Sequence, residues 1–220
     1  AVSAILFATF LGVLLGILSA IYKDSWLDRI SLLFATSGMA LPSFFVGIII
    51  AWVFGYLLAD YTGLNMTGSL YEVDDLGRGE YLALSNLILP AMTLGVRPLS
   101  VIVQLSRNSM LEVMSQDFVR TAVAKGLSKH IVILKHTLKN ALNPVLTAVS
   151  GMFASLMAGA VFVEIVFAWK GIGWEVVNAL EKYDLPVVMG AVLVIAVIFV
   201  VINMIVDILY GVLDPRVRVS

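Results

Sequence analysis

Most of the residues that could take part in chemistry lie in one stretch, residues 116–142, which reads QDFVRTAVAKGLSKHIVILKHTLKNAL. This stretch holds both histidines of the chain and the basic residues Arg120, Lys125, Lys129, Lys135 and Lys139. The sequence contains no G-x-x-x-x-G-K-[ST] phosphate loop, no H-E-x-x-H zinc motif and no cysteine. We therefore expect no catalytic residue, no metal site and no cofactor, and we expect the basic stretch to bind anionic lipid or an acidic partner.

The rest of the chain is unusually apolar, because 60% of its 220 residues are hydrophobic and only 13% are charged. Soluble domains carry about 45–50% apolar and about 25% charged residues. A membrane helix needs roughly 20 apolar residues. Five stretches meet this need: about 2–22, 31–59, 84–107, 141–168 and 186–213. We predict an all-α integral membrane protein with one domain over 1–220, no nucleic-acid partner, and a kink at Pro42 in the second span.

The basic residues outside the spans are distributed unevenly between the two sides of the membrane. Ten lie on one side: Lys23, Arg29, Arg107, Arg120, Lys125, Lys129, Lys135, Lys139, Arg216 and Arg218. The other side has three: Arg78, Lys170 and Lys182. Since Lys and Arg prefer the cytoplasmic side, this bias places the loop over 108–140 and the C-terminus in the cytoplasm.

The long basic loop has the pattern of two short helices joined by a sharp corner. We predict a helix from about Asp117 to Lys125, a left-handed turn at Gly126, and a second helix over 129–140 that Ser128 caps. The second helix is expected to present an apolar stripe of Ile131, Leu134 and Leu138. A solvated loop that lies on anionic lipid is the alternative, but such a loop does not require a glycine at a corner.

The segments RTAVAKG and KHTLKNALNPVLT resemble the cytoplasmic coupling loop of ABC importer permeases, whose loose pattern is E-A-A-x-x-x-G followed by I-x-L-P. Gly126 and Ala122 match this pattern, whereas Arg120 and Thr121 stand where it has Glu and Ala. These departures are typical of the dipeptide, oligopeptide and nickel permeases. Further segments resemble that subgroup in the right order over about 30–218: ALPSFFVGIII, LILPAMTLG, SRNSMLEVMSQDFVRTA, VFVEIVFAWKGIGW, DLPVVMGAVL and VDILYGVLDPRVR.

The resemblance implies an inner-membrane permease for peptides or a related small solute, with five of the six helices of the type I importer fold and with its N-terminal helix missing. The implied partners are a second permease, which the subgroup suggests is a different chain, two cytoplasmic ATP-binding subunits and an extracytoplasmic solute-binding protein. The residues implied to couple to the ATPase are Asp117, Arg120, Thr121, Ala122, Lys125, Gly126 and Lys129. Small residues at 122 and 126 would keep this helix slim enough to seat in the ATPase. The implied outer gate holds Trp169, Gly171, Gly173 and Trp174.

Charged residues within the spans have two interpretations each. Arg97, followed by Pro98, could line the translocation path and meet a peptide carboxylate, or pair with an acid of the neighbouring subunit. Glu164 and Asp207 lie near opposite span ends, and we expect them to cap or pair there and not to form a proton relay. A membrane-embedded enzyme would need paired acids or a Ser/His pair at matching depth, and a passive channel would not need the ordered loop. We therefore expect a transport subunit that hydrolyses no ATP itself.

Overall fold

The computed structural model describes residues 1–73 and 79–213, with a few side chains in 150–159 and 206–213 left out. The expected positions Arg78, Arg216 and Arg218, and the side chain of Asp207, lie outside the described residues. The long helices are α1 (Val2–Ile21), α2 (Trp26–Ala40), α3 (Ser43–Trp52), α5 (Ser85–Met114), α9 (Asn143–Val166), α10 (Ile172–Glu181) and α11 (Leu185–Leu213). The shorter elements are the π-helical turn η1 (Val53–Leu57), α4 (Ala59–Thr62), β1 (Tyr71–Val73), β2 (Glu80–Leu82), α6 (Asp117–Ala124), α7 (Lys129–Ile131), the π-helical turn η2 (Val132–Thr137) and α8 (Leu138–Ala141).

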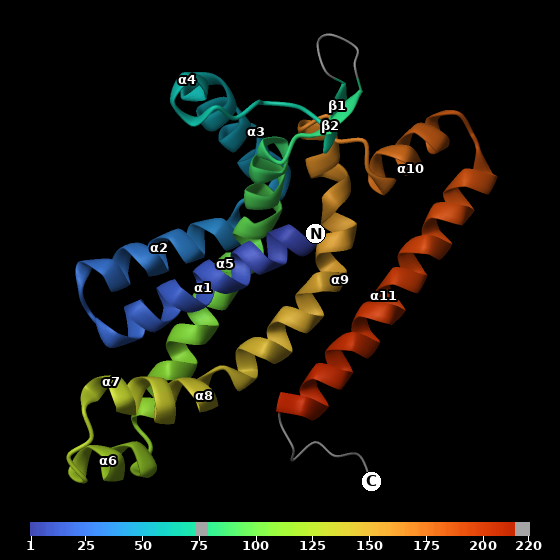
Figure 1. Cartoon of the computed structure of the whole chain (residues 1–220). Coiled ribbons are helices and arrows are strands. Elements are labelled where there is room, and N and C mark those ends of the chain that lie inside the picture. The colour runs from blue at the N-terminus through green and yellow to red at the C-terminus, as the bar shows by residue number, and fades with distance from the viewer. Residues whose placement is uncertain (74–78, 214–220) are drawn as a thin grey trace.

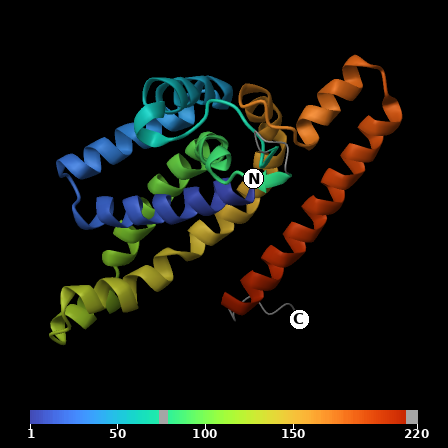
Figure 2. The same ribbon diagram turned by 45° about the horizontal axis from the view of Figure 1, so that its top comes forward.

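Helix α5 is the centre of the structure, and α1, α2, α3 and α9 all pack against it (Figure 1). Its buried residues include Leu89, Leu99 and Ile102, which form the core with α1 and α9. Helix α11 stands apart from this bundle in both orientations (Figures 1 and 2) and contacts mainly α10. None of its membrane-spanning window is buried within the chain, so its apolar surface is left for lipid or another subunit.

Two glycines allow α1 to lie directly against α5. A Cβ at Gly12 would lie 2.8 Å from Ile102 Cγ2, and one at Gly16 would lie 2.5 Å from Ser106 Cβ and 2.8 Å from the Val103 carbonyl oxygen. Close backbone approach of this kind is the usual role of a G-x-x-x-G pattern in a membrane helix. Gly12 and Gly16 therefore bring the backbones of α1 and α5 into close contact.

Replacing Gly16 by alanine is expected to destabilise the chain by about 1–3 kcal/mol, because the added methyl group must push the α5 backbone away. Thermal unfolding of the detergent-solubilised protein would measure this as a lower midpoint temperature. Gly190→Ala on α11 is the matched control, since a Cβ there meets no atom within 4 Å. Equal midpoints for the two variants would contradict this account of the α1–α5 contact.

The stretch 31–59, expected as one span with a kink, consists of helices that meet at a sharp bend. Helix α2 ends at Ala40, Leu41 is extended (φ −84°, ψ 137°), and Pro42 precedes α3. A proline disfavours the helical conformation in the residue before it, which explains the break. The chain bends by 116° between the two arms, Trp26–Ala40 and Ser43–Leu57, so the predicted kink is a turn of more than a right angle.

By length and composition, three helices of the described chain can cross a membrane, or up to four if the bent α2–α3 pair counts as one span. They are Val2–Ile21, Ser85–Met114 and Leu185–Ile205. The stretch expected as the fourth span, 141–168, corresponds to α9, which contains side chains outside the described set. The all-α membrane fold is therefore confirmed. The small antiparallel hairpin of β1 and β2, which pairs Glu72 with Tyr81, is an addition that the sequence pattern did not indicate.

Candidate functional site

Helix α5 is longer than a bilayer needs, and its C-terminal end carries α6 beyond the bundle. Its 30 residues extend about 45 Å at 1.5 Å per residue, against a hydrocarbon core about 30 Å thick. Figure 1 places α6 and α7 at this far end, whereas β1, β2, α4 and α10 lie at the other end of the molecule. The basic loop is therefore an ordered structure that projects from one end of the bundle.

Helix α6 has one buried face and one exposed face. Val119 and Ala122 are buried against Met110 and Val113 of α5 and against residues of η2. Ala122 therefore faces the core of its own chain, and the placement does not support the interpretation that its small size serves a partner. A small side chain is needed here because it lets α6 lie close to the end of α5.

Gly126 ends α6 in the predicted left-handed conformation, with φ +79°. The Gly126 N–H donates to the Val123 carbonyl (2.9 Å) and the Leu127 N–H donates to the Ala122 carbonyl (3.3 Å). This pair of bonds is a Schellman motif, which satisfies two carbonyls that the helix end would otherwise leave unpaired. A Cβ at Gly126 would meet no atom within 4 Å, so glycine is needed here for its conformation and not for space.

The helix after the corner begins at Lys129, as predicted, but its apolar stripe was assigned wrongly. Ser128 occupies the N-cap position without a side-chain cap hydrogen bond. Of the predicted stripe, Ile131 and Leu134 are 45% and 65% exposed, and Leu138 is partly buried against the core. The buried residues are instead Val132, Ile133, Thr137 and Ala141.

The buried side of this second helix includes the π-helical turn η2. A π turn adds about one residue per turn, so Val132 and Thr137, five residues apart, both lie on the buried side together with Ile133. The Thr137 hydroxyl donates to the Val132 carbonyl (3.1 Å) and the Ser109 hydroxyl of α5 donates to the Ala141 carbonyl (2.9 Å). The Ser109–Ala141 bond joins the second helix to α5, while the Thr137–Val132 bond lies within the helix.

We call the exposed side of α6 and its corner the α6 outer face. It consists of Phe118, Arg120, Thr121, Val123, Lys125 and Leu127. Phe118 is 41% and Val123 is 58% exposed, although both lie in a polar loop. Arg120 makes a weak exposed ion pair with Asp117 (3.6 Å). Of the expected coupling residues, Arg120, Thr121 and Lys125 lie on this face, and Asp117 and Gly126 lie at its two ends. Ala122 is buried, and Lys129 follows the corner.

A buried ion pair that the sequence interpretation missed joins α2 to α5. Arg107 Nε lies 2.6 Å from Asp28 Oδ1, and Arg107 Nη2 lies 2.8 Å from Asp28 Oδ2. Asp28 is only 2% exposed and also accepts hydrogen bonds from the Ser19 hydroxyl and from the Asp24 N–H (2.9 Å). The sequence pattern placed Arg107 only among the basic residues of the cytoplasmic side. The spacing Ser25-x-x-Asp28 is typical of a helix N-terminus, and it was the only sequence signal that marked Asp28 as an ordered residue.

The residues expected at an outer gate gather around Glu164, near the end of α9. The Glu164 carboxylate accepts a hydrogen bond from the Trp174 N–H in the first turn of α10 (2.7 Å) and so caps this helix, as expected of an end-of-span acid. A Cβ at Gly171 would overlap the Glu164 carboxylate, and one at Gly173 would lie 2.7 Å from Val161. The glycines therefore let α10 fold back onto α9.

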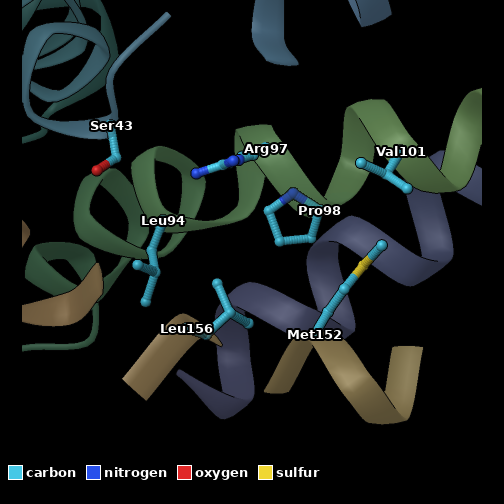
Figure 3. Close-up of a pocket in the computed structure, with 7 residues that line it drawn as sticks. All are labelled: Ser43, Leu94, Arg97, Pro98, Val101, Met152 and Leu156. Carbon is cyan, nitrogen blue, oxygen red and sulfur yellow. The ribbon is translucent and has the colours of Figure 1, made fainter. Parts of the chain in front are cut away.

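Arg97 lies on α5 and borders a cavity of about 230 Å³, whose other lining residues come from α5, α9 and the start of α3 (Figure 3). The neighbouring Pro98 is buried, and α5 continues as a helix through it. Arg97 is exposed within this single chain, and its side chain extends toward the segment that carries Ser43. The structure thus gives the intramembrane arginine an open space to face.

The comparisons with known proteins agree on one family. The sequence profile described as binding-protein-dependent transport system inner membrane component matches residues 12–219. A dipeptide transport system permease protein of Alkalihalophilus pseudofirmus is 39% identical over 98% of this chain and 68% of its own length. The protein of the same description in Escherichia coli K12 is 37% identical over 99% of this chain and 69% of its own length.

The fold is similar to that of a chain in an inward-facing structure of the MetNI methionine ABC transporter. The TM-score is 0.69 at 14% identity, with 96% of this chain and 91% of that chain covered. This likeness supports the fold alone, while the sequence matches extend over nearly the whole chain. The chain belongs to the binding-protein-dependent transport system inner membrane components, the permease subunits of ABC importers.

Proposed function

We propose that this multi-pass permease carries dipeptides or other short peptides into the cell as one of two membrane subunits of an importer. Three further components complete the proposed assembly: a second, non-identical permease, a pair of cytoplasmic ATP-binding subunits, and an external binding protein that delivers the peptide. Support for the substrate class comes from the relatives, which are named as dipeptide permeases and align with nearly all of this chain. The whole chain over 1–220 acts as a single permease domain.

The α6 outer face is proposed to dock on a cytoplasmic ATP-binding subunit. The observation that carries this proposal is that apolar side chains are exposed on a helix at the end of the bundle. Phe118 and Val123 project from a helix that the Schellman corner and the buried face hold rigidly at the end of α5. A rigid-body movement of the nucleotide-binding partner would then move α6 and α5 together. Arg120, Thr121, Lys125 and Lys129, all exposed, would meet acidic groups of the partner.

The opposite end of the molecule, with α10 and the β1–β2 hairpin, is proposed to face the outside and the binding protein. The excess of basic residues around α6 supports this orientation. Trp169 and Trp174 are half-buried beside the Glu164 cap. A movement of α9 would therefore move α10 with it, as an outer gate requires.

Replacement of two exposed apolar side chains on the α6 outer face by serine tests the docking proposal. Phe118→Ser together with Val123→Ser is expected to weaken binding of the ATP-binding subunit by about tenfold or more, because buried aromatic and aliphatic anchors dominate such interfaces. Co-purification of the ATP-binding subunit with the tagged permease measures this loss.

Leu180→Ser is the matched control, since Leu180 is equally exposed but lies on α10 at the other end of the chain. It should leave co-purification unchanged. Full retention of the ATP-binding subunit by the double variant would refute docking through the α6 outer face.

A further inference from the structure

The cavity beside Arg97 combines a positive charge with apolar walls. Leu94 and Pro98 of α5 and Leu156 of α9 supply apolar surface, and Ser43 at the first position of α3 supplies a hydroxyl. Figure 3 shows the Arg97 side chain directed along this space and not into the helix packing. No acidic residue is among the described residues that line the cavity.

The charge of Arg97 has no counterpart in the part of the chain that the structure describes. The two ion pairs present there involve Arg107 and Arg120, and no hydrogen bond joins the Arg97 guanidinium to another described residue. Arg97 lies twelve residues after the start of α5, which corresponds to about 18 Å along the helix and so to the interior of the span. A charge at this depth is costly unless it faces water or an opposite charge.

The N-terminus of α3, which borders the cavity at Ser43, also favours a negatively charged ligand. Helix α3 begins at Ser43 after Pro42, and no side chain caps its first turn. Free N–H groups and the helix dipole make such an end favourable for a negative group. Arginine binds carboxylates through two parallel hydrogen bonds, and the apolar walls suit an aliphatic side chain next to the carboxylate.

We propose that Arg97 binds the C-terminal carboxylate of the peptide as it passes through the permease. This inference rests on the proposed function, because it requires a peptide as the solute. Arg97 would select for a free carboxylate at a point where the binding protein no longer holds the peptide. The Leu94, Pro98 and Leu156 walls would contact the adjoining side chain without selecting its identity.

Uptake by the reconstituted importer provides the first test. Proteoliposomes that contain the complete importer and its binding protein would be supplied with radiolabelled L-alanyl-L-alanine. Arg97→Gln is expected to reduce uptake by about tenfold or more, in line with loss of a charged hydrogen-bond partner. Lys23→Gln removes an exposed positive charge outside the cavity and outside both proposed docking surfaces, and it should not change uptake.

Basal ATP hydrolysis and co-purification of the second permease distinguish this role from a structural one. Both should be unchanged in Arg97→Gln, and Arg97→Lys should recover part of the uptake. Release of the second permease from Arg97→Gln would overturn the proposal in favour of an ion pair between subunits. Uptake by Arg97→Gln equal to that of the native importer would also overturn it.

A second measurement does not depend on transport. The chain has no cysteine, so Val101→Cys gives it a single thiol on the cavity wall. An anionic methanethiosulfonate should modify this thiol faster than a cationic one, and Arg97→Gln should remove the preference. Alanylalanine should slow the modification, and its C-terminal amide should not.

The two proposals can fail separately in this design. If the native importer takes up no alanylalanine, the proposed peptide specificity fails, while the reagent preference at position 101 still tests the anion site. If uptake is normal but the two reagents react at equal rates, the proposed function stands and the role of Arg97 is refuted. Equal protection by the peptide and its amide would likewise refute recognition of the carboxylate.

Discussion

Replacing Asp28 by alanine is expected to destabilise the permease by about 3–5 kcal/mol, because it leaves the charge of Arg107 buried without its partner. Asp28 is almost fully covered and accepts four hydrogen bonds, from Ser19, Asp24 and both nitrogens of the Arg107 fork. All of these contacts lie where α1, α2 and α5 meet. The midpoint of thermal unfolding in detergent would measure the loss.

The exposed ion pair of the same chain serves as the control. Asp117→Ala removes the partner of Arg120, but both side chains are largely in solvent, so the expected loss is below about 1 kcal/mol. The double variant Asp28→Leu with Arg107→Met should regain much of the lost stability, since it removes both buried charges together. Equal midpoints for Asp28→Ala and Asp117→Ala would show that the buried pair does not hold these helices together.

Gly126→Leu is expected to abolish peptide-stimulated ATP hydrolysis and uptake while leaving membrane insertion intact. A leucine in the left-handed conformation costs about 1–2 kcal/mol, so the corner would open and the two Schellman hydrogen bonds would be lost. The α6 outer face would then no longer be held in a fixed position on α5. Peptide uptake and ATP hydrolysis by the reconstituted importer provide the measurement.

Two variants separate the conformational requirement from other effects of the substitution. Gly126→Asn should retain coupling, because asparagine tolerates positive φ better than other residues. Gly63→Leu places the same side chain at a glycine with φ +64° that also has open space around it, but in the connection that follows α4. It should leave coupling intact. Normal coupling in Gly126→Leu would defeat the assignment of α6 as the coupling element.

The sequence predicted features that depend on local chemistry. The start of α6 at Asp117, the positive φ of Gly126 and the new helix at Lys129 all follow from residue types and their spacing. The break at Pro42 was predicted for the same reason, although its size was not. The direction of a chain after a break depends on which surfaces it then packs against, and one sequence does not reveal this.

Features that depend on long-range contacts were missed or misread. The pairing of Asp28 with Arg107 joins residues 79 positions apart, and no local pattern connects them. Helical periodicity selected Ile131 and Leu134, whereas the side of this helix that packs against α5 carries Val132, Ile133 and Thr137. Ala122 was assigned to a partner surface because a small residue beside a corner suits either side of the helix, and only the position of α5 decides between them.

The absence of space between α1 and α5 has a consequence for the transport cycle. Glycines bring the backbones of these two helices together, and the Asp28–Arg107 contact adds α2 to the pair at one end. Helices α1, α2 and α5 cannot slide or rotate against one another without steric overlap, so this block of three helices moves as one rigid body. Helix α6, which packs on the end of α5, would move with this block, and Leu41–Pro42 before α3 is the joint at its border.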